Sequence, residues 1–263
     1  MSAATYAPPL QGIGTPTRPG LVLLTRVEMR KMVDTRSGKW LVGIIAGLSV
    51  VAVVILLFAG DGDFRTFRAF FEASLYPVAV LLPVLGILTV TTEWSQRTAL
   101  TTFTLVPQRW RIAVAKLLAA SGCALVSMGT SLLAATIGNG LTVALDRGDG
   151  SWSFSAGSLG KAALFQVLLI VMGLAFGMLL MNSPLALVLY FVLPTGWSIL
   201  RDLVPRIEKV ASWLDANVAM GVLAEGGTHM TGRMWAHLAT ASAVWVLLPL
   251  ALGAVRLMRR ELK

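Results

Sequence analysis

Apolar residues run along this chain in five long stretches that contain no Asp, Glu, Lys or Arg. They cover residues 40–60, 73–92, 117–145, 162–200 and 234–255. About 20 apolar residues in a helix cross the hydrocarbon core of a bilayer, which is roughly 30 Å thick. Four of these stretches are therefore suited to one membrane span each, whereas 162–200 is too long for a single crossing.

The long stretch is expected to break at Asn182-Ser183-Pro184, because proline cannot continue a helix and disfavours helix in the residue before it. The pattern thus predicts an all-α polytopic membrane protein in which residues 21–263 form a single domain of six transmembrane helices. The expected spans are about 40–60, 73–92, 117–145, 162–181, 184–200 and 234–255.

Composition agrees with this class, since 56% of the residues are hydrophobic and only 13% are charged. Ordinary soluble domains carry about 25% charged residues. The net charge of +9 would suggest a nucleic-acid partner in a soluble protein, but here its distribution follows the spans. With the N-terminus inside, the inner segments hold fourteen Lys and Arg against four acidic residues, and the outer segments hold eight against nine. The positive-inside rule then predicts a multi-pass protein of the cell inner (plasma) membrane, with both termini cytoplasmic and no nucleic-acid partner.

Three segments outside the apolar stretches have patterns of their own. Residues 1–20 are rich in Pro, Gly and Thr and are expected to be a disordered cytoplasmic tail. Residues 21–34 predict an amphipathic helix at the cytoplasmic interface, although an N-terminal extension of the first span is an alternative. Residues 201–233 are too long for a tight turn and too polar to span, which favours short helices capping the outer end of the bundle. In the segment 21–34 the apolar side holds Leu21, Val22, Met29, Met32 and Val33, and the polar side holds Arg26, Arg30 and Asp34.

Motifs of catalytic or metal-binding chemistry are scarce along the chain. His229 and His237 are eight residues apart and cannot form an i, i+4 metal pair, and no HExxH, CxxC or GxSxG occurs. The stretch SAGSLGKA (155–162) is similar to half a phosphate loop, but Ser155 replaces the first glycine and Ala162 follows Lys161. We therefore expect neither a metal site nor catalytic residues. No charged residue lies in the middle of a span, which argues against a carrier driven by protons.

The most informative segment follows the second span and reads TTEWSQRTALTTFTLVPQRWRIAVAK (91–116). It resembles the membrane subunit of type-2 ABC exporters, the superfamily of bacterial drug, antibiotic and lipid export permeases. In many small members a glutamate and an aromatic residue end the second span, and a short leucine-containing helix, a proline, arginines and a lysine follow. The positions that match are Glu93-Trp94, Thr98, Leu105, Pro107, Arg109 and Lys116, while Arg97 departs from the pattern at the usual glycine.

The resemblance implies a transport subunit that is not itself an enzyme. Two permease chains, identical or different, would form the pathway, and separate cytoplasmic ATPase subunits would bind ATP and magnesium, so that this chain carries no cofactor. The segment after the second span would supply a coupling helix that docks on the ATPase, with Glu93, Arg97, Thr98, Phe103, Leu105, Arg109 and Arg111. The substrate route would run along spans two and five, with Tyr76, Leu85, Thr89, Tyr190, Pro194 and Trp197 as candidate lining residues.

Two alternatives stay open at this point. The arginines of the loop are also explained by the positive-inside rule and by contacts with lipid headgroups. A membrane-embedded enzyme or sensor subunit that works without an ATPase is the competing function, and it would need polar side chains that converge at one membrane depth. The apolar lining expected of the spans suits hydrophobic or amphiphilic cargo, such as a drug, antibiotic, peptide or lipid.

Overall fold

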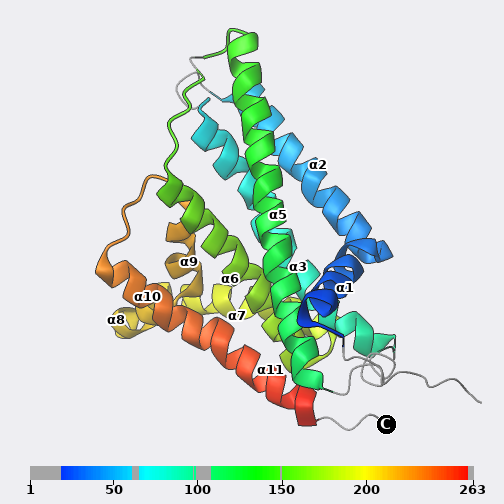
Figure 1. The fold of residues 1–263 in the computed structure, drawn as a ribbon. Helices are drawn as coiled ribbons and strands as arrows, with labels where there is room; N and C mark the ends of the chain where they lie inside the picture. The colour runs from blue at the N-terminus through cyan, green and yellow to red at the C-terminus, as the bar shows by residue number, and fades with distance from the viewer. Residues whose placement is uncertain (1–18, 61–64, 97, 99–107, 149, 260–263) are drawn as a thin grey trace, which may run out of the picture.

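The protein is a bundle of long α-helices (Figure 1). The computed structural model describes residues 19–60, 65–96, 98, 108–148 and 150–259, and this part of the chain contains no strand. The predicted tail, apart from its last two residues, lies outside the described residues. The long helices are α2 (Arg36–Ala59), α3 (Phe67–Ser95), α5 (Arg109–Ala144), α6 (Ala156–Leu180) and α7 (Ser183–Leu203). A sixth rod consists of α10 (Gly232–Ser242), η3 (Ala243–Leu247) and α11 (Leu248–Arg259), and the short α1 (Leu21–Asp34) precedes α2.

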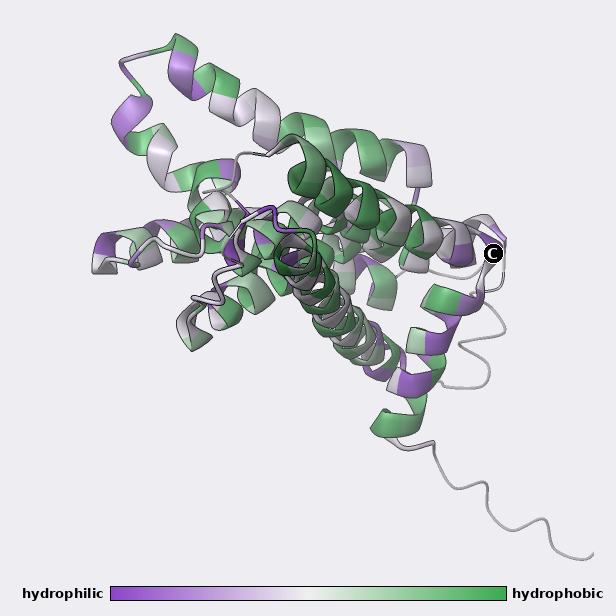
Figure 2. Cartoon of the chain, turned by 90° about the horizontal axis from the view of Figure 1, so that it is seen from above, coloured by the Kyte–Doolittle hydropathy of each residue, from purple (hydrophilic) through white to green (hydrophobic). Residues whose placement is uncertain are grey.

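Six helices are long and apolar enough to cross a membrane, which confirms the predicted all-helical class and number of candidate spans. Most of them extend beyond the apolar stretches, because charged residues occupy their end turns. Helix α3, for example, begins six residues before 73 and takes in Arg68 and Glu72. Figure 2 shows that hydrophobic residues cover most of the long helices, while hydrophilic residues gather near their ends. Much of the apolar surface faces outward, as on α2, where Ile55 and Phe58 are more than half exposed. A bilayer would cover such a surface.

The chain reverses direction between α6 and α7 at the position that the sequence predicted. Met181 adopts a left-handed conformation (φ 51°) and ends α6. The side chain of Asn182 accepts a hydrogen bond from the backbone N–H of Leu185 at 3.0 Å and so caps α7. Pro184 lies in the first turn of α7, where a missing N–H costs no helical hydrogen bond.

Helices α3 and α6 form the centre of the bundle and approach each other at three glycines, Gly86, Gly173 and Gly177. A Cβ atom on Gly86 would lie 2.6 Å from the carbonyl oxygen of Ile170, and one on Gly177 would lie 2.9 Å from the carbonyl oxygen of Ile87. Small residues allow helix backbones to pack this closely in a membrane protein. By contrast, the small-residue pair Gly43 and Gly47 on α2 faces open space.

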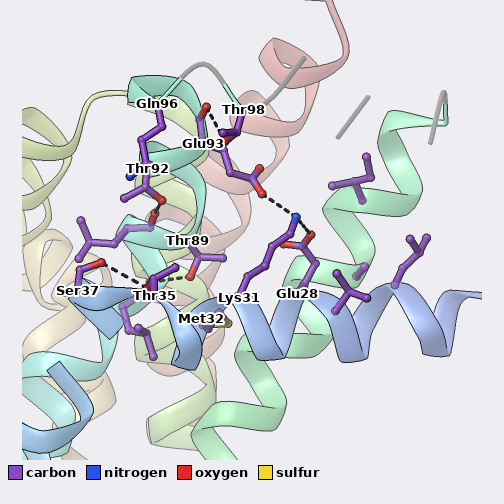
Figure 3. Close-up of a pocket in the computed structure, with 16 residues that line it drawn as sticks. Glu28, Lys31, Met32, Thr35, Ser37, Thr89, Thr92, Glu93, Gln96 and Thr98 are labelled. Carbon is purple, nitrogen blue, oxygen red and sulfur yellow. Dashed lines mark hydrogen bonds and ion pairs between the residues drawn. The ribbon is translucent and has the colours of Figure 1, made fainter. Parts of the chain in front are cut away.

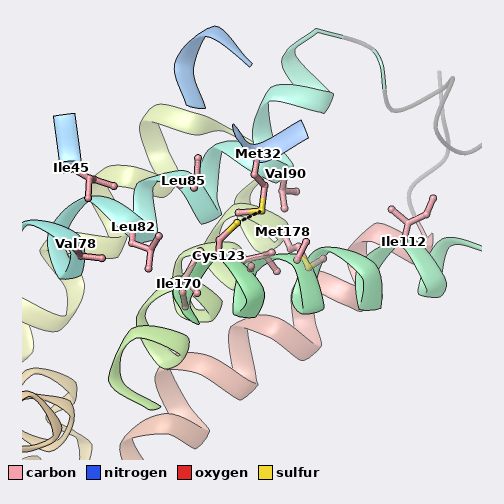
Figure 4. Close-up of a cluster of buried hydrophobic side chains, with 14 of the residues drawn as sticks. Met32, Ile45, Val78, Leu82, Leu85, Val90, Ile112, Cys123, Ile170 and Met178 are labelled. Atoms are coloured by element: carbon pink, nitrogen blue, oxygen red, sulfur yellow. Dashed lines mark hydrogen bonds between the residues drawn. The ribbon is translucent and has the colours of Figure 1, made fainter. Parts of the chain in front are cut away.

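Three clusters of buried apolar side chains fill the bundle. The largest joins α1, α2, α3, α5, α6 and α11, and Figure 4 shows part of it. Within it, Met32 of α1 packs on Cys123 of α5, with 3.9 Å between the two sulfur atoms. Through this contact α1 packs against the long helices, so α1 is part of the folded core.

The sixth rod changes its helical pitch at η3, a five-residue π-helical turn from Ala243 to Leu247. Pro249 follows in the first turn of α11 and cannot donate a backbone hydrogen bond. A π-turn usually occurs as a single turn inside a longer α-helix, and here residues Gly232–Arg259 form one such rod. The two halves of the rod therefore remain continuous across the proline.

Short helices cover the end of the bundle opposite α1, as the sequence predicted for residues 201–233. They are α8 (Glu208–Ala211), η2 (Ser212–Leu214) and α9 (Ala216–Ala224). Asp215 caps α9 by accepting a hydrogen bond from the backbone N–H of Val218 at 3.0 Å. Its other carboxylate oxygen lies 2.7 Å from Nη1 of Arg201 on α7, and this ion pair attaches the short helices to a long one.

Candidate functional site

Four charged side chains from three helices meet where α1 crosses the bundle. Glu28 and Lys31 lie three residues apart on α1, so both project from one side of the helix. Glu93 stands in the last turn of α3, and Lys116 stands in the third turn of α5. We call these four residues the ion network.

The distances within the ion network are short. Nζ of Lys116 lies 2.6 Å from Oε2 of Glu28 and 3.0 Å from Oε1 of Glu93. Nζ of Lys31 lies 2.7 Å from Oε1 of Glu28 and 3.1 Å from the same Oε1 of Glu93. Lys116 also donates a hydrogen bond to the backbone carbonyl of Thr89 at 3.2 Å. Each lysine thus bridges two carboxylates, and α1, α3 and α5 are joined at a single point.

The ion network pairs two ammonium groups with two carboxylates and is buried unequally. The side chains of Lys116 and Glu28 are 3% and 5% exposed, whereas that of Lys31 is 40% exposed. Burial by itself would raise the pKa of Glu28, but the ammonium groups of Lys116 and Lys31 outweigh burial and lower that pKa below its ordinary value. Burial likewise opposes the charge of Lys31, while Glu28 and Glu93 raise the pKa of Lys31 above its ordinary value. Glu28 and Lys31 are therefore held in their charged forms near neutral pH, because each has opposite charges in contact.

A pocket of about 520 Å³ opens beside the ion network and is bounded by α1, α2, α3 and α5 (Figure 3). Its wall is mostly apolar, with Leu24 and Val27 from α1 and Leu85 and Leu88 from α3. Its charged residues are Glu28, Lys31 and Glu93, and the uncharged polar residues that line it are Thr35, Ser37, Thr89, Thr92, Gln96 and Thr98. We call this cavity the α1 pocket.

The ion network stands next to the connection between α3 and α5, and both ends of this connection are held. Glu93 precedes the connection and pairs with both lysines. Arg109 follows it and donates hydrogen bonds to the carbonyl oxygens of Leu257 and Met258 at the end of α11, at 3.2 and 3.3 Å. The guanidinium of Arg111 donates to the carbonyl oxygen of Pro19, just before α1, at 2.6 Å. A displacement of the connection would thus act on α1, α3, α5 and α11 together.

The residues predicted for coupling fall into two groups. Glu93, Thr98, Arg109 and Arg111 are described, and the hydroxyl of Thr98 donates to the carbonyl oxygen of Glu93 at 3.4 Å. Arg97, Phe103 and Leu105 lie outside the described residues. The described members lie at the two ends of the connection.

The residues predicted for a substrate route lie in separate places. Leu85 and Thr89 line the α1 pocket. Tyr76 is exposed and lines an apolar groove of about 980 Å³ between α2 and α3. These two hollows lie at different heights along α3, because Tyr76 precedes Leu85 by two and a half helical turns.

The three α7 members of the same prediction lie elsewhere. Tyr190 and Pro194 are buried and line a smaller pocket of about 220 Å³ between α3, α6, α7 and α9. Trp197 donates its indole N–H to the carbonyl oxygen of Ala211 at 3.1 Å and so supports the short helices of the cap. The six candidate lining residues therefore do not form one surface within a single copy of the chain.

The stretch similar to a phosphate loop has a structural role. Ser155 caps α6 by accepting a hydrogen bond from the backbone N–H of Ser158 at 3.1 Å. Nζ of Lys161 donates to the carbonyl oxygens of Glu225 and Thr228 at 2.7 and 2.8 Å. The lysine thus holds the turn that follows α9.

Sequence reasoning missed Glu28 and Lys31 as site residues and noted Lys116 only as part of a motif. Glu28 lies between Val27 and Met29, and a carboxylate in an apolar setting is a signal for a buried partner. The sequence could not predict which residue pairs with Glu28, because Lys116 is 88 residues away along the chain.

No protein-family model matches the chain, and comparison with characterised proteins gives no match either. Function is therefore inferred from the residues and their geometry.

Proposed function

We propose that this chain is the membrane-spanning permease subunit of an ATP-binding-cassette exporter. It moves a hydrophobic or amphiphilic substrate, such as a drug, antibiotic, peptide or lipid, out of the cytoplasm. A separate cytoplasmic subunit binds and hydrolyses ATP with magnesium, and a second permease chain completes the pathway. Six candidate spans and the distribution of Lys and Arg support a multi-pass protein of the plasma membrane with both termini in the cytoplasm.

The observation that carries the proposal is the way in which the connection between α3 and α5 is anchored. Its first end is paired through Glu93 with Lys31 and Lys116, and its second end is bonded through Arg109 to the end of α11. A loop that only linked two spans would need no such anchors. A segment that receives force from an ATPase needs them, because a rigid attachment passes its displacement to several helices.

Charge on the connection suits an acidic partner surface. Arg97, Arg109 and Arg111 are permanently charged, and arginine pairs with carboxylates through two parallel hydrogen bonds. Phe103 and Leu105 supply apolar side chains for a groove on the partner. Charge and apolar residues within one short segment are what a docking element requires.

The test is co-purification from the native membrane. The proposal expects a nucleotide-binding protein to accompany this chain, ATP hydrolysis in the complex, and none in the chain alone. Reversal of charge at Arg97 and Arg109 together should lower ATP turnover in the complex, while reversal at Arg206 and Lys209, at the other end of the bundle, should not. A catalytic activity that survives without any ATPase would contradict the proposal and favour a membrane enzyme or sensor.

A further inference from the structure

The α1 pocket has two unused polar positions of opposite kind. Lys31 donates hydrogen bonds to Glu28 and Glu93, which leaves one of its three ammonium hydrogens without an acceptor among the described residues. Glu93 contacts both lysines through Oε1, and within the described part of the chain Oε2 receives no hydrogen bond. Figure 3 shows the Lys31 ammonium and the Glu93 carboxylate facing each other at one end of the pocket. A ligand there meets one free donor and one free acceptor side by side.

We propose that the α1 pocket binds a phospholipid with a primary-amine headgroup, of the phosphatidylethanolamine class. The phosphate of such a headgroup accepts a hydrogen bond from Lys31, and its ammonium donates to Oε2 of Glu93. Both contacts are charge-assisted, which makes them stronger than hydrogen bonds between neutral groups. Because the charges of the ion network balance, a zwitterionic headgroup leaves the pocket neutral.

The charge pattern discriminates among common headgroups. An anionic glycerol headgroup would place a phosphate near Lys31 but would offer no positive charge to Glu93. A choline headgroup carries the positive charge but has no N–H to donate. Only a headgroup whose charged amine carries an N–H satisfies both Lys31 and Glu93. A headgroup that left one charge unpaired would be costly in a pocket whose surface is mostly apolar.

The apolar part of the pocket wall suits the chains of a lipid. Leu24, Leu85 and Leu88 form this part, beside the charged residues of the pocket. A volume of about 520 Å³ is in the range of sites for drug-sized groups, so it accommodates the headgroup and the upper part of the chains. Beyond the pocket, Val22 and Leu23 expose apolar surface on α1 along which the chains would continue. The pocket lies at the end of the bundle that we assign to the cytoplasm, where α1 would meet the inner leaflet.

The lipid would hold α1 against α3 and thereby strengthen the same contact that the ion network makes. This role does not depend on transport or on an ATPase, so the binding can be tested on the full chain alone.

Native mass spectrometry of the purified, delipidated full chain tests the proposal with added phosphatidylethanolamine, phosphatidylcholine and phosphatidylglycerol of identical acyl chains. We expect one phosphatidylethanolamine to be retained per chain, preferred over the other two by on the order of tenfold, as expected for one charge-assisted hydrogen bond. Soluble phosphoethanolamine should not displace it. Displacement at equal concentration would show that the site takes a free zwitterion and would overturn the assignment to a lipid.

Three variants make the test specific. Glu93→Gln removes the acceptor charge with little change in shape and should bring retention of phosphatidylethanolamine down to that of phosphatidylcholine. Thr92→Phe fills the pocket without altering any charge and should reduce retention of all three lipids. Glu72→Gln in the groove between α2 and α3 is the matched control and should leave the preference unchanged. Equal retention of the three lipids by the unaltered chain, or an undiminished preference in Glu93→Gln and Thr92→Phe, would refute the proposal.

Discussion

Lys116 on α5 and Glu28 on α1 form an ion pair of 2.6 Å with both side chains almost completely buried. The pair connects residues 88 positions apart and fixes the helix before the first span to the third candidate span. A buried ion pair contributes little net stability compared with apolar residues, but removal of one partner leaves the other charge buried and uncompensated. The pair is therefore a specific attachment of α1, and its burial makes it sensitive to the loss of either member.

Lys116→Met should lower the free energy of unfolding by about 3–5 kcal/mol, because Glu28 loses its most buried partner. The combination of Lys116→Met with Glu28→Leu should restore much of this loss. Denaturant or thermal unfolding of the purified chain measures both. Arg30→Gln is the matched control, since its pair with Asp34 on the same helix is exposed and such pairs contribute about 0–1 kcal/mol. A Lys116→Met variant as stable as Arg30→Gln would contradict the burial of the pair.

The stability of the chain should fall at acidic pH because of Glu28 and at alkaline pH because of Lys31, both on α1. The pKa of Glu28 is lowered from 4.5, so its contribution is present above pH 4.5 and is lost as the pH falls through the lowered value. The pKa of Lys31 is raised from 10.5, so its contribution is present below pH 10.5 and is lost as the pH rises through the raised value. Unfolding temperature measured from pH 3 to 11 should show both losses, and Lys31→Met should remove part of the alkaline one. Identical alkaline profiles for the two proteins would exclude this role of Lys31.

Gly86→Ala should destabilise the chain, because the added Cβ would lie 2.6 Å from the carbonyl oxygen of Ile170 and would force α3 away from α6. The expected loss is about 1–3 kcal/mol, the usual range for an overpacked core. Gly129→Ala on α5 meets nothing within 4 Å and should be neutral or should stabilise by up to about 1 kcal/mol through helix propensity. The unfolding temperatures of the two variants should therefore shift in opposite directions or differ clearly in size.

Asp215→Ala should loosen the cap at the end of the bundle opposite α1. Asp215 is fully buried and accepts hydrogen bonds from Arg201, Ser198 and the N–H of Val218. Loss of this buried partner should cost about 3–5 kcal/mol. Asp202→Asn removes a carboxylate that pairs with the same arginine but is 66% exposed, and it should cost less than about 1 kcal/mol. Hydrogen exchange of residues 208–224 would report the difference, and equal exchange in both variants would contradict it.

The sequence predicted the helices well and the ion network poorly, for physical reasons. Apolar runs define spans locally, and Pro184 marks the break between α6 and α7 without reference to the rest of the fold. The ion network depends on how three helices are placed, so the sequence showed Glu28 only as one of the four acidic residues of the inner segments. The side of α1 that is buried also differs from the apolar side predicted for residues 21–34. Met32 and Val22 were both assigned to that side, but Met32 is buried whereas Val22 is 84% exposed. Long-range pairing of a charged residue is a property of packing and not of local periodicity.

We propose that the ion network and the anchored connection transmit force from an ATPase, and ATP turnover of any nucleotide-binding complex that co-purifies with this chain tests this proposal most directly. Glu93→Gln weakens the attachment of the connection while nearly preserving its shape, and Arg30→Gln on the exposed side of α1 is the control. If the network transmits force, turnover per intact complex should fall several-fold in Glu93→Gln and stay unchanged in Arg30→Gln. Equal turnover in both variants, or the absence of any nucleotide-binding partner, would contradict the claim.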